Sequence, residues 1–369
     1  MSNTTPLHLP NLRRRFLKIA ATTAGLWGLG LTSAKAQTGK APEQLRIGYQ
    51  KSAVNLVILK QQGALEKLFP NTKVTWAEFP AGPQLLEALS VGSLEFGLTG
   101  DSPPVFAQAA GKDLLYVGAE PPKPDSSAVL VLGDSPIKKL ADLKGKKIAL
   151  QKGSSAHYLL VRAVEKAGLT WSDIQPIYLA PADARAAFER KSVDAWAIWD
   201  PFYAATELAI KPRVLATGRD LSSNNSFYLA SKPFVTQHES TLLVLLRELT
   251  RADGVAQNNR KEAIKLISDF SGLDAGVVSL FIQRRPASPV GPLSAATIAD
   301  QQRVADAFFK LGLIPKPVKV ADIVWRIGAP PRSGLAAASP SRGRHLQPGA
   351  AGSALALVKP HVTTTSRSF

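Results

Sequence analysis

The 369-residue chain is long enough to form two domains with sizeable hydrophobic cores. It contains no cysteine, which excludes disulfides, thiolate metal sites and a lipid anchor on an N-terminal cysteine. The formal net charge is +17, but ten of these charges lie in residues 1–36 and 331–369, which contain no acidic residue. The remaining +7 is interleaved with acidic residues over 37–330. It therefore favours anionic partners weakly and does not argue for nucleic acid.

Residues 1–36 have the composition of an export signal peptide. A basic segment at 13–18 precedes an uncharged run over 19–34, and Ala34-Lys35-Ala36 is a small-residue cleavage site. The Arg-Arg-x-Phe-Leu-Lys pattern resembles a twin-arginine signal. Because Leu12 stands where Ser or Thr is usual, the twin-arginine and Sec routes both stay open. The run is too short and too rich in glycine for a membrane anchor, so we expect a soluble periplasmic protein.

Short apolar strands alternate with amphipathic helices along most of the chain, which is typical of parallel sheets with right-handed crossovers. The pattern predicts a first series of strands at 45–50, 74–79, 96–99 and 114–119, with helices at 56–68, 84–90 and 103–109. It predicts a second series of strands at 128–132, 148–150, 174–179, 195–198 and 226–230, with helices from 154, at 182–190 and from 201. A helical part follows, at 242–256, 260–270, 275–282 and 295–311.

The predicted fold class is α/β, with two lobes that each contain a mostly parallel sheet flanked by helices. We expect lobe 1 to combine 37–127 with 231–330, and lobe 2 to be the insertion 128–230. The strands near 128–132 and 226–230 are the expected crossings and would serve as the hinge. Residues 331–369 are rich in Ala, Ser, Gly and Pro, carry no acid and show no period, so we expect disorder there.

The segment 146–164 carries the clearest candidate for an anion site. Its pattern predicts a buried strand, a turn at Gly153 and a helix capped by Ser154 or Ser155. A strand, a glycine turn and a helix start aim free backbone N–H groups and hydroxyls at an anion. His157, in the first helical turn, could add a further donor. Capping alone would also explain the two serines, because most helix caps hold no ligand.

A second edge of the same kind lies at Thr99-Gly100-Asp101-Ser102. Ligands sit beyond the carboxyl ends of the strands in open α/β sheets. Two such edges, facing each other across a cleft, predict a small anion bound between the lobes. Asp101 is the exception, because a carboxylate repels anions. It either caps the helix at Pro103 or accepts a bond from the ligand or from a neighbouring donor.

The stretch 195–203 places several aromatic residues at the carboxyl end of a strand. We expect Trp196 in the core, whereas Trp199, beside the helix entry, is the better candidate for an apolar ligand wall. Two arginine positions leave alternatives open. Arg185 pairs either with a ligand anion or with Asp183, and a surface ion pair is the commoner case. The Arg284-Arg285 pair either reaches the cleft or lies in a solvated loop.

The signatures of common catalytic sites are missing. The sequence contains no Gly-x-Ser-x-Gly elbow, no P-loop, no Gly-x-Gly-x-x-Gly and no His-Glu-x-x-His. Of the five histidines, only His157 and His238 lie outside the two ends, which leaves little for a transition-metal site in a chain without cysteine. We therefore expect no catalytic activity, no cofactor and no metal.

Seven runs of the sequence resemble the periplasmic aliphatic-sulfonate-binding proteins of ABC importers. They occur in order from about Leu45 to Trp325, and several are long enough to be specific. The runs are Tyr49-Gln50-Lys51, Glu78-Phe-Pro-Ala-Gly-Pro-Gln84, Thr99-Gly-Asp-Ser-Pro-Pro-Val-Phe-Ala-Gln-Ala-Ala110, Glu120-Pro-Pro-Lys-Pro124, Gln151-Lys-Gly-Ser-Ser155 with His157, Pro181-Ala-Asp-Ala-Arg-Ala-Ala-Phe188 and Val193-Asp-Ala-Trp-Ala-Ile-Trp-Asp-Pro201.

This resemblance implies a type II-like periplasmic binding fold that closes over an alkanesulfonate for sulfur supply. It also implies delivery to a membrane permease with a cytoplasmic ATPase, by a protein that we expect to be a monomer. Taurine-binding and nitrate-binding proteins share the fold, as do enzymes that make pyrimidine precursors, and these are the alternatives. The residues expected at the ligand are Tyr49, Gln50, Gly100, Asp101, Gly153, Ser154, Ser155, His157, Trp199 and Arg285.

A sulfonate suits such a site chemically. It is ionised at every relevant pH and offers three acceptor oxygens, which backbone N–H groups and hydroxyls at two helix starts can satisfy. The alkyl part needs an apolar wall, which Trp199 and Tyr49 could supply, whereas sulfate would make no use of that wall. The chain departs from the family after Trp325, where about forty residues of unlike composition follow. A frameshifted or misassigned reading frame near Arg326 would explain this departure.

Overall fold

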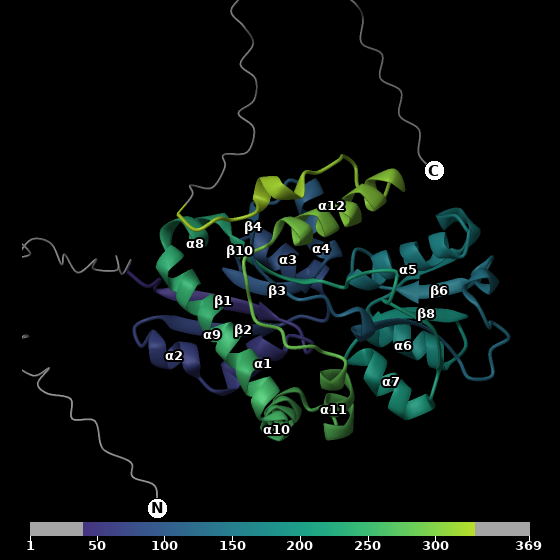
Figure 1. Ribbon diagram of the computed structural model, residues 1–369, viewed down its shortest axis with the longest axis horizontal. Coiled ribbons are helices and arrows are strands. Elements are labelled where there is room, and N and C mark those ends of the chain that lie inside the picture. The colour runs from purple at the N-terminus through teal and green to yellow at the C-terminus, as the bar shows by residue number, and fades with distance from the viewer. Residues whose placement is uncertain (1–39, 329–369) are drawn as a thin grey trace, which may run out of the picture. The chain divides into compact units, whose positions relative to one another are not determined.

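The computed structural model describes residues 40–328. The expected export signal at 1–36 and the expected disordered stretch at 331–369 lie outside these residues. All the described residues belong to one compact unit, which contains two five-stranded sheets (Figure 1). The predicted fold class is confirmed, because each sheet is mostly parallel and is flanked by helices.

The first sheet has the strand order β2-β1-β3-β10-β4. Its strands are β1 (Gln44–Tyr49), β2 (Lys73–Glu78), β3 (Phe96–Gly100), β4 (Leu114–Glu120) and β10 (Ser226–Ser231). β1 pairs in parallel with β2 and β3, whereas β10 runs antiparallel between β3 and β4. Buried Val, Ile, Leu and Phe side chains fill both faces of the sheet, as expected for strands covered by helices on each side.

The second sheet has the strand order β7-β6-β8-β5-β9. Its strands are β5 (Ser127–Val131), β6 (Lys147–Leu150), β7 (Gln175–Tyr178), β8 (Ala195–Trp199) and β9 (Arg213–Thr217). β6 pairs in parallel with β7 and β8, and β5 runs antiparallel between β8 and β9. The two sheets thus repeat one plan, with a single antiparallel strand in the fourth position.

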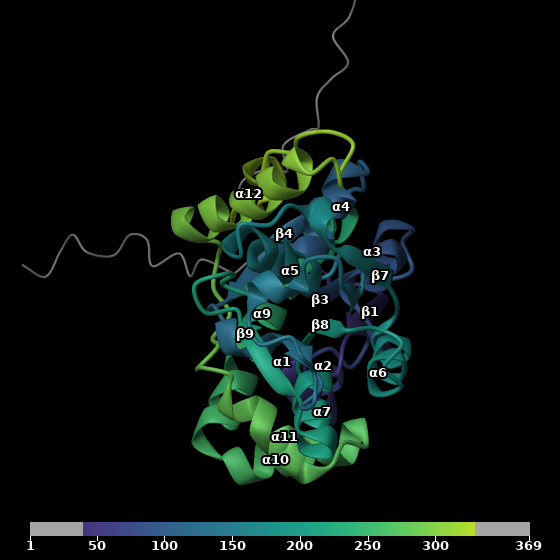
Figure 2. The same ribbon diagram turned by 90° about the vertical axis from the view of Figure 1, so that its right-hand side faces the viewer.

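Helices cover both faces of each sheet. One face of the first sheet packs against α1 (Val54–Gln61), α8 (Lys232–Gln237), α9 (Glu239–Asn258), α10 (Arg260–Ser271) and α11 (Ala275–Gln283). The short helix α2 (Ala64–Leu68) lies alongside these helices. The other face packs against α3 (Gly82–Ser90), α4 (Ser102–Ala109) and α12 (Ala295–Lys310). The second sheet carries α5 (Ser155–Lys166) on one face and α6 (Pro181–Glu189) with α7 (Phe202–Ile210) on the other, as Figure 2 shows.

Three local features differ from the sequence-based expectations. The helix expected at 56–68 is two helices, because Gly63 adopts a left-handed conformation with φ of 55°. The edge strand β9 was not predicted, since all five of its residues are only partly buried and show no alternation. The short helix α8 was also not predicted, because it directly follows β10 and is only six residues long.

The hinge expectation needs a correction. Strand 226–230 was assigned to lobe 2, but β10 hydrogen-bonds only with β3 and β4 of the first sheet. β5 likewise pairs only with strands of the second sheet. Neither strand therefore crosses between lobes, and the two connections are the non-strand segments 121–126 and 218–225. The backbone N–H of Lys123 donates to the Ser223 carbonyl at 2.9 Å, so the two connections are hydrogen-bonded to each other.

Candidate functional site

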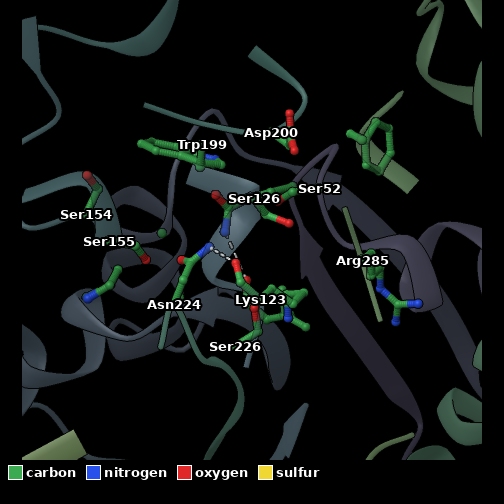
Figure 3. Close-up of a pocket in the computed structure, with 16 residues that line it drawn as sticks. Ser52, Lys123, Ser126, Ser154, Ser155, Trp199, Asp200, Asn224, Ser226 and Arg285 are labelled. Atoms are coloured by element: carbon green, nitrogen blue, oxygen red, sulfur yellow. Dashed lines mark hydrogen bonds between the residues drawn. The ribbon is translucent and has the colours of Figure 1, made fainter. Parts of the chain in front are cut away.

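A cavity of about 60 Å³ lies between the two sheets, lined by residues of both (Figure 3). Three of its walls come from the carboxyl ends of parallel strands: Gln50 follows β1, Gly100 ends β3 and Trp199 ends β8. The start of α5 adds two serines, and the connections 121–126 and 218–225 close one side. This is where open α/β sheets place their ligands. The polar and apolar lining side chains include Gln50, Ser52, Lys123, Ser126, Ser154, Ser155, Trp199, Asp200, Asn224, Ser226, Phe281 and Arg285.

The start of α5 presents hydrogen-bond donors to the cavity. Gly153 has a φ of 73°, which lets the chain turn sharply after β6, and Ser154 is the helix N-cap. The Ser154 hydroxyl donates to the Gln151 carbonyl at 2.8 Å and so stabilises the turn. The first backbone N–H groups of a helix, here Ser155 and Ala156, have no carbonyl partner within it. Together with the helix dipole, they form a favourable site for an anion.

The edge at Gly100 differs from this arrangement, although the sequence patterns are alike. α4 begins at Ser102 and continues with Pro103 and Pro104, which carry no backbone N–H. This helix start therefore offers the cavity few donors. Two equivalent anion-binding edges were expected, and the structure corrects this to one donor-rich edge, at α5, facing a donor-poor one.

Asp101 lies behind the cavity wall and does not line the cavity. Its side chain does not cap α4, in contrast to one of the two predicted roles. It accepts hydrogen bonds from the hydroxyls of Ser102 (2.9 Å) and Ser222 (3.4 Å), and it also interacts with Ser155. Burial raises the pKa of Asp101 to about 6, although the bonds from Ser102 and Ser155 oppose this rise.

Trp199 forms the apolar wall of the cavity and also borders a second chamber. This chamber has a volume of about 230 Å³ and shares Gln50, Ser52 and Trp199 with the first cavity. Its remaining lining includes Pro80, Pro201, Phe202, Ala205 and Leu273, with Lys51, Glu78 and Arg185 as the charged members. A smaller cavity, into which several hydroxyl and amide groups project, thus adjoins a larger chamber at the Trp199 ring.

Two cations line the cavity, and both are paired within the protein. Arg285 donates to Asp253 at 2.7 Å and to Asn55 at 2.9 Å, and in Figure 3 its guanidinium points away from Ser154 and Ser155. Lys123 donates to Glu120 at 2.8 Å. Burial alone would raise the pKa of Glu120, but Lys123 and Arg285 outweigh it and hold that pKa below its ordinary value. These ion pairs therefore neutralise most of the positive charge near the cavity.

Several predicted site residues lie outside the cavity. Gly153 is behind its wall, against the ring of Phe106. His157 is fully buried behind the turn that Gly153 begins. Tyr49 packs in the core of the first lobe against Trp76 and Phe270, with ring centroids 6.4 and 5.4 Å away. The expectation that Tyr49 forms part of the apolar wall is therefore corrected. Gln50, Gly100, Ser154, Ser155, Trp199 and Arg285 do line the cavity.

The other arginines whose partners the sequence could not decide, Arg185 and Arg284, also form ion pairs within the protein. Arg185 pairs with Glu189 at 2.7 Å, one helical turn along α6, and not with Asp183. Arg284 pairs with Asp200 at 3.0 Å and also with Glu207. Trp196 is fully buried, as predicted.

Sequence reasoning missed the residues contributed by the two connections between the sheets. The cavity is lined by Lys123, Ser126 and Asn224. These residues lie in segments without a helix or strand periodicity of apolar residues, so the sequence pattern gave no signal for them. The Asn224 amide donates to the Lys123 carbonyl at 2.9 Å, so these residues join the two connections (Figure 3). Their location could have been inferred from topology, because a chain that passes between two lobes must border the space between them.

The described residues 40–328 contain neither a candidate metal site nor a candidate membrane span. No group of three or more His, Cys, Asp or Glu side chains within them could hold a metal ion. None of the helices in this range is long and apolar enough to cross a membrane.

Two five-stranded α/β lobes with a cavity between them form the fold of the two-lobed solute-binding proteins. The family described as NMT1/THI5 like matches residues 73–263. The alkanesulfonate-binding protein SsuA from Xanthomonas axonopodis pv. citri, solved bound to MOPS, is 51% identical with a TM-score of 0.76, covering 78% of this chain and 99% of that one. The periplasmic aliphatic sulphonate binding protein SsuA from Escherichia coli is 47% identical with a TM-score of 0.73, over 82% and 99% of the two chains.

A protein of Escherichia coli (strain K12) described as an aliphatic sulfonates-binding protein is 48% identical over 313 residues, which is 85% of this chain and 97% of the relative. The chain belongs to the family of aliphatic sulfonate-binding proteins. All three of these relatives are described as binding proteins and not as enzymes.

Proposed function

We propose that this protein captures aliphatic sulfonates in the cavity between its two lobes and delivers them to an ABC importer. One observation carries the proposal. The cavity places the donor-rich start of α5 beside Trp199, so that a donor set for an anion adjoins an apolar surface. The identity to alkanesulfonate-binding relatives supports this choice of ligand.

The head group would bind in the smaller cavity. Its volume of about 60 Å³ suits a compact anionic group. The N–H groups at the start of α5 would donate to the sulfonate oxygens. The Ser155 hydroxyl would turn from Asp101 to the ligand, whereas the Ser154 hydroxyl stays bonded to the Gln151 carbonyl. A monoanion needs no dedicated cation here, which agrees with the internal pairing of Lys123 and Arg285.

The organic tail would extend past Trp199 into the second chamber. This chamber is about 230 Å³ in volume and offers Phe202, Ala205 and Leu273 as apolar contacts. Each methylene buried there is worth about 0.8 kcal/mol. Affinity should therefore rise with chain length until the chamber is full. Inorganic sulfate and nitrate have no tail and gain nothing from it.

The cellular setting follows from the relatives and from the N-terminus. The Escherichia coli relative is described as periplasmic. Residues 1–36 resemble an export signal, of either the twin-arginine or the Sec type. We place the protein in the periplasm, as a monomer that serves a permease and a cytoplasmic ATPase. Lobe 1 would consist of the first sheet with its helices and lobe 2 of the second, hinged at 121–126 and 218–225.

Isothermal titration of the chain without residues 1–36 tests the proposal. The ligands are methane-, butane- and hexanesulfonate, with taurine, sulfate and nitrate for comparison. We expect the alkanesulfonates to bind, with the dissociation constant (Kd) falling as the chain grows. If taurine or nitrate binds more tightly than every alkanesulfonate, the protein is a taurine-binding or nitrate-binding protein and the proposed ligand is wrong. Absence of binding by all six ligands would contradict the proposed site itself.

A further inference from the structure

His157 lines neither chamber, yet it contacts the turn that precedes α5. We propose that His157 is a positioning residue: its Nδ1 atom accepts the Gly153 N–H and so holds the turn from which Ser154 and Ser155 reach the ligand. This inference rests on the proposed function, because it names how the head-group site is built. It replaces the sequence-based expectation that His157 donates to the anion directly.

The hydrogen bond fixes the tautomer of the ring. The Gly153 nitrogen lies 3.2 Å from His157 Nδ1, and the backbone N–H can only donate. Nδ1 must therefore carry no hydrogen, and the proton of the neutral ring is on Nε2. No hydrogen-bond partner of Nε2 exists among the described residues. The ring is thus oriented by the hydrogen bond that it accepts from the turn and by the aromatic rings around it.

The turn depends on this acceptor. Gly153 is buried, so its N–H group would lack a partner if the ring were absent. An unpaired buried N–H is costly, and the chain would rotate to satisfy it. Any rotation at position 153 moves the next two residues, Ser154 and Ser155, which line the cavity. A change at His157 would then weaken head-group binding without any contact between the ring and the ligand.

Aromatic rings from both lobes surround the imidazole. Phe106 of α4 and Phe308 of α12 come from the first lobe, with ring centroids 6.2 and 5.1 Å from that of His157. Trp171 and Tyr178 come from the second lobe, at 5.1 and 5.7 Å. This aromatic cage of four rings is therefore complete only when the lobes are together. The position of the turn is thus coupled to lobe closure.

The cage also keeps the ring neutral. Burial, assisted by the nearby Lys152 charge, lowers the pKa of His157 to about 3. Protonation would place a hydrogen on Nδ1 and abolish its role as an acceptor. Because the pKa lies far below the physiological range, the acceptor persists wherever the protein is folded and functional.

Two substitutions separate the acceptor from the bulk of the ring. In His157→Asn the Oδ1 atom stands at the same bond separation from Cα as Nδ1 and can accept the Gly153 N–H, whereas His157→Leu keeps an apolar side chain without an acceptor. We expect His157→Leu to raise the Kd about tenfold for methanesulfonate and hexanesulfonate alike, and His157→Asn to stay within about threefold of wild type. Equal losses in both variants, or no loss in His157→Leu, would overturn the inference.

A measurement on the unaltered protein covers the case in which a variant fails to fold. With histidine labelled by ¹⁵N, the nitrogen shifts of His157 report which nitrogen carries the proton. We expect the Nε2–H tautomer throughout pH 5–8, without titration. A proton on Nδ1, or a titration in that range, would refute the proposal. This readout needs no ligand, so it stays decisive even if the titrations show that sulfonates do not bind.

Discussion

The Ser155 hydroxyl of the second lobe occupies the space that a side chain at Gly100 of the first lobe would need. A Cβ atom at position 100 would lie 1.8 Å from Ser155 Oγ and 3.2 Å from Ser155 Cβ. Gly100 is therefore required by the approach of the other lobe and not by its own backbone conformation. The two lobes meet here directly, at the edge of the cavity.

Gly100→Ala should hinder the meeting of the lobes. The added methyl either displaces the Ser155 hydroxyl or holds the lobes apart, and overpacking of this kind costs about 1–3 kcal/mol. We expect the Kd for methanesulfonate to rise roughly five- to 150-fold, as measured by calorimetric titration. Gly254→Ala is the control, because nothing lies within 4 Å of a Cβ at that position.

A double mutant shows whether the methyl acts through Ser155. Gly100→Ala combined with Ser155→Gly removes the atoms that would clash, so the two losses should be less than additive. Strict additivity would mean that the alanine acts elsewhere in the lobe.

Arg284 forms a second contact between the lobes. It follows α11 of the first lobe, lies 3.8 Å from the ring centroid of Tyr203 and pairs with Asp200 and Glu207 of the second lobe. Arg284→Met should leave Asp200 buried without its cation and lower the free energy of unfolding by about 3 kcal/mol. Urea denaturation measures this loss.

Two controls accompany Arg284→Met. Adding Asp200→Asn removes the unpaired charge and should restore most of the lost stability. Arg185→Met breaks a partly exposed pair with Glu189 and should cost less than about 1 kcal/mol. A loss in Arg185→Met as large as that in Arg284→Met would show that the loss does not depend on burial.

The alternation of strands and helices was readable from the sequence because each element buries an apolar face with its own period. The donor-rich turn at Ser154 was predictable for a related reason, since capping chemistry is local. Trp199 could be assigned to the cavity because it ends a strand. Local patterns therefore sufficed wherever a residue's role depends on its own element.

The rest of the site depends on contacts that no local pattern encodes. β10 belongs to the first sheet because it inserts between β3 and β4, far earlier in the chain. Lys123 and Asn224 border the cavity through the two connections, which have no period. Tyr49 was expected in the apolar wall because it is aromatic and ends a strand, but its ring points into the core, whereas the next side chain, Gln50, lines the cavity. Pairing partners of buried charges, such as Asp253 for Arg285, were equally hidden.

The buried carboxyl of Asp101 predicts a dependence of stability on pH. Its folded pKa of about 6 lies above the ordinary value of 3.8, so the folded state retains a proton that the unfolded state has lost between these pH values. Stability should therefore fall as pH rises from about 4 to 6. Asp101→Asn removes this penalty, which is at most about 3 kcal/mol at 1.36 kcal/mol per pKa unit.

Urea denaturation of wild type and Asp101→Asn at pH 4 and pH 7.5 tests this sign. The Oδ1 atom of asparagine can still accept from the Ser102 hydroxyl, and its amide NH2 can donate to the Ser222 oxygen, so most of the local hydrogen bonding is preserved. We expect the variant to gain stability relative to wild type at pH 7.5 and to gain little at pH 4. A constant difference at both pH values would show that the carboxyl does not titrate in this range.

The second chamber predicts selectivity for the tail. Ala205 of α7 lines the chamber, whereas Ala209 is exposed near the end of the same helix and does not line it. Ala205→Phe should fill part of the chamber and raise the Kd for hexanesulfonate about tenfold, with little effect on methanesulfonate. Ala209→Phe is the matched control for the change in helix composition. An equal loss for both ligands in Ala205→Phe would indicate damage to the fold or to lobe closure.

Ser155 and Trp199 should differ in how their loss depends on ligand length. Ser155→Ala removes one charge-assisted hydrogen bond to the head group, worth about 1.5–3 kcal/mol, or roughly ten- to a hundredfold in Kd, equally for methane-, butane- and hexanesulfonate. Trp199→Ala removes the wall between the two chambers, so its cost should grow along the series, by up to ~0.8 kcal/mol for each methylene that the ring had buried. Calorimetric titration of both variants against the three ligands separates the roles. A uniform loss for Trp199→Ala would mean that the ring supports the core and that the alkyl chain binds against other residues of the second chamber.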